Sequence, residues 1–307
     1  MKRSLIALSA ACLLGAGLGA AVTTRAAGAP AAAAGAPAPA PAAAPKAAHT
    51  IVLCAPGYPG NTVQAQPAMD AFARAVEKTA GLPSGSLGAA YFESEGAGIE
   101  RLRQPDVVLA LTTIPFFLQD GGKAGLAPKL SVVRNGSPSQ QWSLIAKKGR
   151  VGAAADMEGW ELTGPAGYAP GFVQTLLAGW GPLRSSTKIT FAPAPLGALK
   201  RVVDGENLAV LLEPEQVQAL FPKHPFANDL EIVATSKPVP GSVVCAVNGR
   251  MDEAAVAKIL DALIRLQSSP DGAEALKTLR IDRFATLDPK ALAWLQRGPA
   301  GDGTLKK

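Results

Sequence analysis

The sequence has few of the side chains on which catalytic and metal sites depend. It contains 2 histidines, 3 cysteines and 5% aromatic residues in a chain of 307. His49 precedes the first predicted strand and His224 lies in a turn between prolines, and neither has a second histidine or cysteine at metal-ligand spacing. Nucleophile motifs of the type Gly-x-Ser-x-Gly and phosphate-cradling motifs of the type Gly-x-x-x-x-Gly-Lys-Ser are also missing. We therefore predict that the protein is not an enzyme and uses no metal and no cofactor.

Paired acids are the remaining candidates for a hydrolytic site. Glu93 and Glu95 are close in sequence, as are Glu213 and Glu215. A hydrolytic pair needs two carboxyl groups aimed at one bond, and solvated surface acids explain such neighbours equally well. The sequence therefore favours binding over catalysis.

Long runs of one charge sign are absent as well. The chain has 30 basic and 24 acidic residues, for a formal charge of +6. Three of the bases, Lys2, Arg3 and Arg25, fall in a predicted signal that contains no acid, so 27 bases remain against 24 acids. This small excess does not predict a nucleic-acid partner.

The N-terminal residues have the three parts of a secretory signal. Lys2 and Arg3 are followed by the uncharged stretch 5–22 and by small residues before Ala27. We predict a cleaved signal over residues 1–26 and a location in the periplasm. Cys12 is out of step with a lipoprotein signal, so we do not expect lipidation there. Residues 27–48 are almost entirely Ala, Pro and Gly, which predicts a disordered tether.

The rest of the chain repeats one pattern of strands and helices. Residues 49–135 are predicted to run strand–helix–strand–helix–strand, and residues 159–235 do so again. Such alternation indicates an α/β fold with mostly parallel sheets flanked by helices. Residues 141–147 and 242–248 are interpreted as two crossing strands. We predict two lobes, the first made of residues 49–142 plus 243–307 and the second of residues 143–242, with hinge segments near Ser143–Lys147 and Val239–Ser242.

Polar residues follow the strands where ligands bind in open α/β sheets. Such ligands lie beyond the carboxyl ends of the strands, near the helix N-termini that come next. Turns at these positions, together with one residue beside the first crossing, supply the candidate ligand-binding residues Tyr58, Thr112, Thr113, Gln141, Gly167, Tyr168 and Glu213. Capping and turn formation explain each turn alone, and their shared placement at one cleft favours binding.

Several segments carry a family resemblance in their order and spacing. They are Asp106–Thr113, Asp156–Gly159, Gly164–Gly171, Leu176–Gly181, Leu199–Gly205 and Ser236–Pro240. The chain resembles the periplasmic phosphate/phosphonate-binding-protein-like family, the solute receptors of ABC importers with the type II two-lobed fold. This resemblance implies an exported solute-binding protein that captures a small anionic or polar ligand, of the phosphate/phosphonate-like oxyanion class, between its lobes. It also implies a membrane ABC permease as partner.

One departure from that family favours an alternative function. The family's second-lobe loop usually offers a Ser/Thr-Ser-Gly series, whereas residues 167–171 are Gly-Tyr-Ala-Pro-Gly, with no serine or threonine hydroxyl. The alternative is a non-transporting sensor or scaffold on the same fold, with a degenerate ligand site.

Two cysteines remain after signal cleavage, Cys54 and Cys245. Both lie in apolar strand-like runs, where either a disulfide or a buried thiol is compatible with an exported protein. The family resemblance implies an intervening strand between them, about 10 Å apart and too far for a disulfide.

Overall fold

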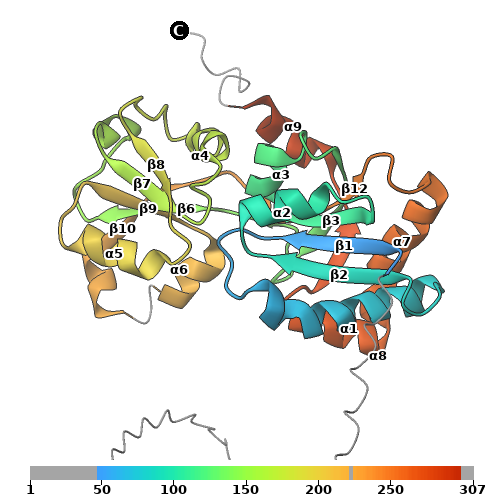
Figure 1. Cartoon of the computed structure of the whole chain (residues 1–307). Helices are drawn as coiled ribbons and strands as arrows, with labels where there is room; N and C mark the ends of the chain where they lie inside the picture. Colours follow the sequence, from blue (N-terminus) through green and yellow to red (C-terminus); the bar gives the residue numbers. More distant parts are fainter. Residues whose placement is uncertain (1–46, 221–223, 299–307) are drawn as a thin grey trace, which may run out of the picture. The chain divides into compact units, whose positions relative to one another are not determined.

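The computed structural model describes residues 47–220 and 224–298. The predicted signal of residues 1–26, with Cys12, lies outside the described residues, and so does the predicted tether up to residue 46. The described chain forms two mixed sheets flanked by helices, which are joined by a short ribbon (Figure 1). The predicted α/β fold class is confirmed.

The first sheet has six strands in the order β13-β4-β12-β3-β1-β2. Its parallel strands are β1 (His49–Cys54), β2 (Leu87–Phe92) and β3 (Val107–Thr113). Antiparallel pairing joins β12 (Ser242–Val247) to β3 and β4 (Leu126–Val133), and β13 (Arg283–Thr286) to β4. The carboxyl ends of β1 and β2 point toward the second sheet (Figure 1).

Helices cover both faces of this sheet because its strands are apolar on both sides. Successive residues of a strand face opposite ways, so Ile51 and Leu53 pack in one core cluster and Val52 and Cys54 in another. The first cluster is completed by α1 (Thr62–Ala80), α7 (Glu253–Arg265) and α8 (Pro270–Thr278). The second is completed by α2 (Glu95–Leu102), α3 (Ile114–Asp120) and α9 (Pro289–Arg297).

The second sheet has five strands in the order β10-β6-β9-β7-β8. Strands β7 (Glu161–Gly164), β8 (Lys188–Phe191) and β9 (Leu208–Leu212) are parallel, and β6 (Ser143–Lys147) is antiparallel to both of its neighbours, β9 and β10 (Leu230–Thr235). Apolar residues of α4 (Pro170–Leu177) and α5 (Pro195–Val203) pack in separate clusters against it. The short helix α6 (Pro214–Leu220) follows β9.

The ribbon between the sheets is shorter than the predicted crossings, and one of its two strands lies within the predicted hinge segment Val239–Ser242. It pairs β5 (Ser139–Gln140) with β11 (Val239–Pro240). The predicted crossings over residues 141–147 and 242–248 were wrong, because Ser143–Lys147 is β6 inside the second sheet and Ser242–Val247 is β12 inside the first. Both runs are strongly apolar and buried, which suits strands with two neighbours better than an exposed crossing.

The two sheets share part of one apolar core. A single cluster of buried residues extends from the first sheet through α3, α4 and α9 to the second sheet. Within it, the indole of Trp142, next to the ribbon, meets the ring of Phe172 in α4 edge to face, with ring centroids 5.7 Å apart. The sheets are therefore held together by apolar packing along the side that carries these three helices.

The cysteines are free, as the family resemblance implied. Strand β3 lies between β12 and β1, so Cys245 and Cys54 are not on neighbouring strands. Both side chains are buried, and burial raises the pKa of each thiol to about 12. Neither thiol is therefore a nucleophile at neutral pH.

Candidate functional site

A buried polar contact joins the loop after β1 to the end of β9. The hydroxyl of Tyr58 donates a hydrogen bond of 2.6 Å to Oε2 of Glu213, and the side-chain amide of Gln140 donates one of 3.3 Å to Oε1. Glu213 is 5% exposed. Tyr58 belongs to the first sheet's loops, Glu213 to the second sheet and Gln140 to the ribbon, so the contact joins three parts of the molecule.

A second polar contact joins β3 to the loop before α4. Oγ1 of Thr113 lies 3.2 Å from the hydroxyl of Tyr168, at hydrogen-bonding distance. The ring of Tyr168 meets Phe191 at the end of β8 edge to face, with ring centroids 5.6 Å apart. Burial raises the pKa of Tyr168, and the charge of Glu213 raises it further, so the two polar contacts lie in one region.

The loops on either side of this region touch each other. Gly57 has a φ of +86°, and a Cβ at this position would lie 2.9 Å from Cβ of Pro165 in the loop after β7. Only glycine allows this approach without a shift of the backbone. The structure therefore shows the junction closed, with Tyr58 in contact with Glu213 and Thr113 in contact with Tyr168; Thr113 and Glu213 are buried and the two tyrosines are half-buried.

The junction contains an acid that is not paired with a base. Among the described residues, Glu213 makes no ion pair, and burial raises its pKa to about 7, with a further increase from Glu215. The hydrogen bond from Tyr58 and the charge of Arg134 oppose this shift. The guanidinium carbon of Arg134 lies 5.7 Å from the centroid of the Tyr58 ring. Burial and the nearby Glu213 in turn raise the pKa of Tyr58.

Thr112 and Thr113 do not act together, although both were predicted at the site. Neighbouring residues of a strand point to opposite faces of its sheet. Thr113 contacts Tyr168, whereas Thr112 is 0% exposed and lies beside the thiol of Cys245 in the core. Oγ1 of Thr112 is a buried oxygen without a conventional hydrogen-bond partner among the described residues.

In this closed arrangement Gly167 contributes to the packing of its loop rather than to a ligand site. Its N–H donates a hydrogen bond of 3.1 Å to the carbonyl of Gly164. A Cβ at Gly167 would lie 1.8 Å from the carbonyl oxygen of Thr190 in β8. The glycine thus lets the loop pack against β8, and this packing positions the neighbouring Tyr168.

Gln141 lies at the ribbon, apart from the other predicted residues. Its amide donates a hydrogen bond of 3.0 Å to the carbonyl of Ser236. It lines a polar cavity of about 490 Å³ beside the ribbon. The other lining residues include Arg134, Gln140 and Glu215. Nε of Arg134 is buried without a hydrogen-bond partner among the residues described.

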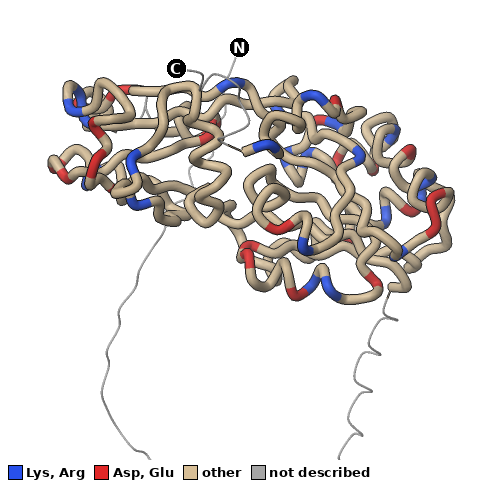
Figure 2. Tube along the Cα trace, turned by 90° about the horizontal axis from the view of Figure 1, so that it is seen from above, with Lys and Arg blue, Asp and Glu red and all other residues tan. Residues whose placement is uncertain are grey.

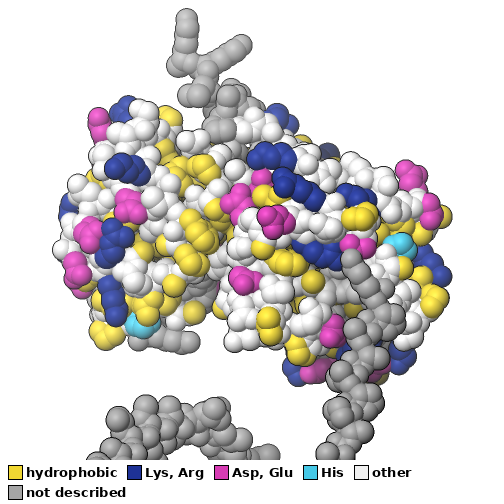
Figure 3. Space-filling view, in the orientation of Figure 1, with side chains coloured by type: hydrophobic (Ala, Val, Ile, Leu, Met, Phe, Trp, Pro, Cys, Tyr) yellow, Lys and Arg dark blue, Asp and Glu magenta, His cyan; other side chains and the backbone are white. Residues whose placement is uncertain are grey.

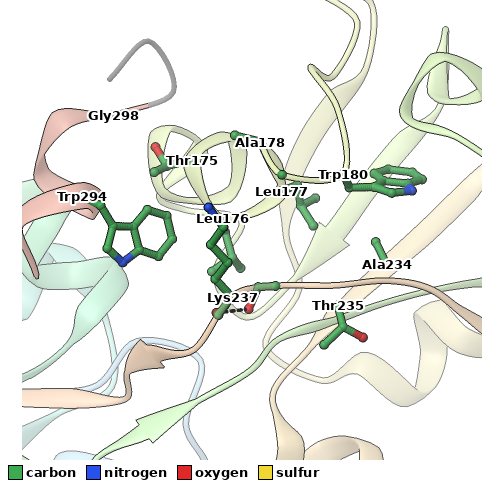
Figure 4. Close-up of a pocket in the computed structure, with 12 residues that line it drawn as sticks. Thr175, Leu176, Leu177, Ala178, Trp180, Ala234, Thr235, Lys237, Trp294 and Gly298 are labelled. Carbon is green, nitrogen blue, oxygen red and sulfur yellow. Dashed lines mark hydrogen bonds between the residues drawn. The ribbon is translucent and has the colours of Figure 1, made fainter. Parts of the chain in front are cut away.

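A smaller cavity of about 270 Å³ lies at the end of α4. Figure 4 shows Trp294 of α9 on one side and Trp180 on the other, with Leu176 and Lys237 between them. None of the predicted ligand-binding residues lines this cavity.

The described surface carries both charge signs and no metal-type cluster. Basic and acidic residues are interspersed along the trace (Figure 2). Over residues 47–220 and 224–298, no three His, Cys, Asp or Glu side chains come together as a metal site would require, and no helix is long and apolar enough to span a bilayer. Apolar side chains gather near the border between the two halves of the molecule (Figure 3). Val63, 82% exposed, and Phe191, 45% exposed, are the large apolar side chains that stand out beside the candidate site.

Two residues at the site, Gln140 and Arg134, were not selected from the sequence. Gln140 is not among the seven candidate residues, although it precedes Gln141, and it is the one that contacts Glu213. Arg134 is not among them either, and no sequence motif marks it. The signal available was its place at the carboxyl end of a buried strand, the same criterion that selected the other candidates.

One comparison with known proteins identifies the family of this chain. The model of the family described as "ABC transporter, phosphonate, periplasmic substrate-binding protein" matches residues 123–292. A search of curated proteins finds no match.

Three solved structures share the fold at low sequence identity. XAC2383 from Xanthomonas citri, bound to ATP, matches with a TM-score of 0.62 and 19% identity, over 82% of this chain and 96% of that one. A binding protein component of an ABC phosphonate transporter from Pseudomonas aeruginosa has a TM-score of 0.58 and 15% identity, over 84% and 90%. PhnD1 from Prochlorococcus marinus, in complex with methylphosphonate, has a TM-score of 0.55 and 13% identity, over 81% and 97%.

Proposed function

Since this chain belongs to the phosphonate family of periplasmic substrate-binding proteins of ABC transporters, we propose that it captures a small oxyanion-bearing ligand between its two sheets and presents it to a membrane ABC permease. The mechanism is closure of two lobes about the β5–β11 ribbon, in which no bond is broken. The lobes are those expected from the sequence, residues 49–142 plus 243–307 and residues 143–242.

The observation that carries this proposal is the junction itself. Polar side chains of the two sheets form two contacts across the junction, Tyr58 with Glu213 and Thr113 with Tyr168, in which Thr113 and Glu213 are buried and the tyrosines are half-buried. Burying polar groups has a cost unless they are hydrogen-bonded, so a junction meant only to hold two bodies together would be expected to use apolar side chains. Polar groups that face each other when closed are available to a ligand when open.

The ligand class follows from the donors that the junction offers. The hydroxyls of Tyr58, Thr113 and Tyr168 are hydrogen-bond donors, and Arg134 supplies positive charge beside Tyr58. These groups suit an oxyanion such as a phosphonate. Glu213 repels a bare anion when ionised, so a bound oxyanion requires that Glu213 be protonated or that the ligand also carry a donor. The relatives' recorded ligands, methylphosphonate and ATP, are both phosphorus oxyanions.

The route of export belongs to the same proposal. Residues 1–26 direct the chain to the periplasm and are removed, and residues 27–48 separate the fold from the cleavage site. Mass spectrometry of the secreted protein tests this, with an N-terminus at Ala27 as the expected result. A retained Met1 would contradict it.

Thermal shift of the secreted protein tests the capture of a ligand. The panel contains phosphate, phosphite, alkylphosphonates, sulfate, amino acids and small carboxylates. A ligand at 100 times its dissociation constant stabilises the fold by about 2.7 kcal/mol. We expect a hit among the oxyanions that is weakened at least tenfold by Thr113→Val. The matched control is Thr112→Val, which alters the adjacent residue on the opposite face and is expected to leave the affinity unchanged.

A second candidate function is a sensor or scaffold that does not transport. Two observations favour it: the junction's polar groups satisfy one another without a ligand, and the loop of residues 167–171 lacks serine and threonine. Absence of any hit across the panel would favour this function. Loss of growth on a phosphonate as phosphorus source after deletion of the gene would favour transport.

A further inference from the structure

The surroundings of the Glu213 carboxyl group at the junction depend on whether the two sheets are closed or separated. When the sheets are closed, Glu213 is 5% exposed and hydrogen-bonded to Tyr58 and Gln140. When they separate, Tyr58 leaves with the first sheet and Glu213 meets water. Water stabilises the ionised carboxylate, whereas the closed junction disfavours it.

We propose that this junction is a proton-operated latch, which closes when Glu213 is protonated and loosens when Glu213 ionises. The inference rests on the proposed capture of a ligand, because it describes how the same opening and closing is regulated. In the protonated state the carboxyl can accept from Tyr58 and donate to the amide oxygen of Gln140 once that amide has turned. In the ionised state a negative charge is left in a junction without a paired base.

Burial is the largest influence on Glu213 and disfavours its ionised form, while the groups around it act in both directions. Tyr58, on the β1–α1 loop, and the amide of Gln140 donate to it and favour the ionised form, and Tyr168, on the loop before α4, lies close enough for their charges to interact. Glu215 on α6 disfavours the ionised form, while Arg134 at the end of β4 favours it. Arg134 does not pair with Glu213 and instead lies against the ring of Tyr58. The net result is a pKa of about 7 for Glu213 in the closed state.

The sign and size of the pH effect follow from linkage. The ordinary pKa of a glutamate is 4.5, and the closed state raises that of Glu213 to about 7. The closed state therefore holds a proton that the open state releases, and closure weakens as the pH rises from 4.5 through 7. The ratio of open to closed molecules is expected to rise about 30-fold between about pH 5.5 and about pH 8.5.

A second carboxyl group near the junction, that of Glu95, also has a raised pKa. The pKa of Glu95 on α2 is raised by burial and by the adjacent Asp120 of α3, and Lys123 opposes this. Burial raises the pKa of Tyr168, and the charges of Glu95 and Asp120 raise it further. A pH response of the whole protein must therefore be assigned to Glu213 by comparing variants.

Distance measurement between two spin labels tests the latch in the ligand-free secreted protein. Val63→Cys in α1 and Ile232→Cys in β10 place the labels at exposed positions of the two sheets, 82% and 47% exposed, while Cys54 and Cys245 are buried and do not react. Between about pH 5.5 and 8.5 we expect the population with the longer distance to grow. The Glu213→Gln variant, which is neutral at every pH, is expected to keep the shorter distance throughout.

The control variant and the contrary outcomes separate the latch from other causes. Glu95→Gln is expected to keep the pH response of the parent protein. An unchanged distance in the parent, or an equal response in Glu213→Gln, would overturn the latch. If Glu213→Gln does not fold, Tyr58→Phe is measured in its place. Because this variant lacks the hydroxyl that donates to Glu213, its opening is expected to occur at lower pH than in the parent. An opening profile at the same pH as the parent's counts against the latch. The experiment contains no ligand, so failure to find a ligand would sink the capture function and leave the latch standing.

Discussion

Replacing Thr112 and Thr113 by valine, one at a time, is expected to change the stability of the fold in opposite directions. Valine has the same shape as threonine and lacks only the hydroxyl, so each substitution removes one oxygen from one face of β3. The two positions are adjacent in sequence, in the same strand and both buried. Any difference between them must therefore come from what each hydroxyl contacts.

The magnitudes follow from those contacts. Oγ1 of Thr113 makes a hydrogen bond of 3.2 Å with Tyr168, and a neutral hydrogen bond contributes about 0.5–1.5 kcal/mol. Oγ1 of Thr112 lies in the core beside a thiol, without a conventional partner among the described residues, and an unsatisfied buried polar group costs about 1–3 kcal/mol. Thr113→Val should thus lose about 1 kcal/mol, and Thr112→Val should gain about 1 kcal/mol.

Urea unfolding of the two variants and the parent, followed by circular dichroism, measures both changes. We expect equal denaturant slopes, because neither substitution alters the surface exposed on unfolding. In thermal unfolding the two variants should lie on opposite sides of the parent, each by about 2–4 °C. If Thr112→Val destabilised the protein by 1 kcal/mol or more, the hydroxyl of Thr112 would have a partner and the reasoning about the two faces of β3 would fail.

Three further predictions concern other parts of the fold. Gly167→Ala is expected to lower stability by about 3 kcal/mol in urea unfolding, because the new methyl group collides with the backbone of β8; a neutral result would contradict the packing of this loop. The guanidinium of Arg101 holds the pKa of Asp106 below its usual value, so this pair stabilises the fold above about pH 4, and the stabilisation is lost as the pH falls. Asp106→Asn should lower the free energy of unfolding by about 2 kcal/mol at pH 7 and flatten the acid limb of a stability–pH curve. An acid limb unchanged by the substitution would refute this role of the pair. Cys54 and Cys245 should not react with a thiol reagent at pH 8 until the protein is unfolded, since burial raises both pKa values to about 12; rapid labelling of the native protein would show that the first sheet opens.

The sequence predicted those parts of the fold that depend on local pattern. The alternation predicted over residues 49–135 is found in β1, α1, β2, α2 and β3, and that predicted over residues 159–235 in β7, α4, β8, α5 and β9. Apolar runs and helix-start signals are properties of a few consecutive residues, which is why they can be identified without the structure. The position of the crossings could not be identified, because Ser143–Lys147 and Ser242–Val247 have the same apolar pattern whether they join the sheets or lie within them.

The candidate site was predicted in part for the same reason. The ends of parallel strands meet at one edge of a sheet, so Tyr58, Thr113, Tyr168 and Glu213 could be grouped from their positions after strands. The pairing of Tyr58 with Glu213, and the closed state of the junction, depend on how the two sheets approach each other, which no local pattern encodes. Neighbouring residues of a strand face opposite sides of its sheet, so Thr112 and Thr113 could have been assigned to different faces if the face of β3 toward the site had been known.

The position of β12 has a consequence for the order in which the chain folds. This strand lies between β3 and β4, yet it comes from residues 242–247, after the whole second sheet. Until that segment is available, β4 lacks the strand that connects it to β3, and the first sheet stays in two pieces. The second sheet, by contrast, is built entirely from residues 143–235. Because contacts between residues close in sequence form faster than distant ones, the second sheet is expected to form first and the first sheet to be completed by insertion of β12.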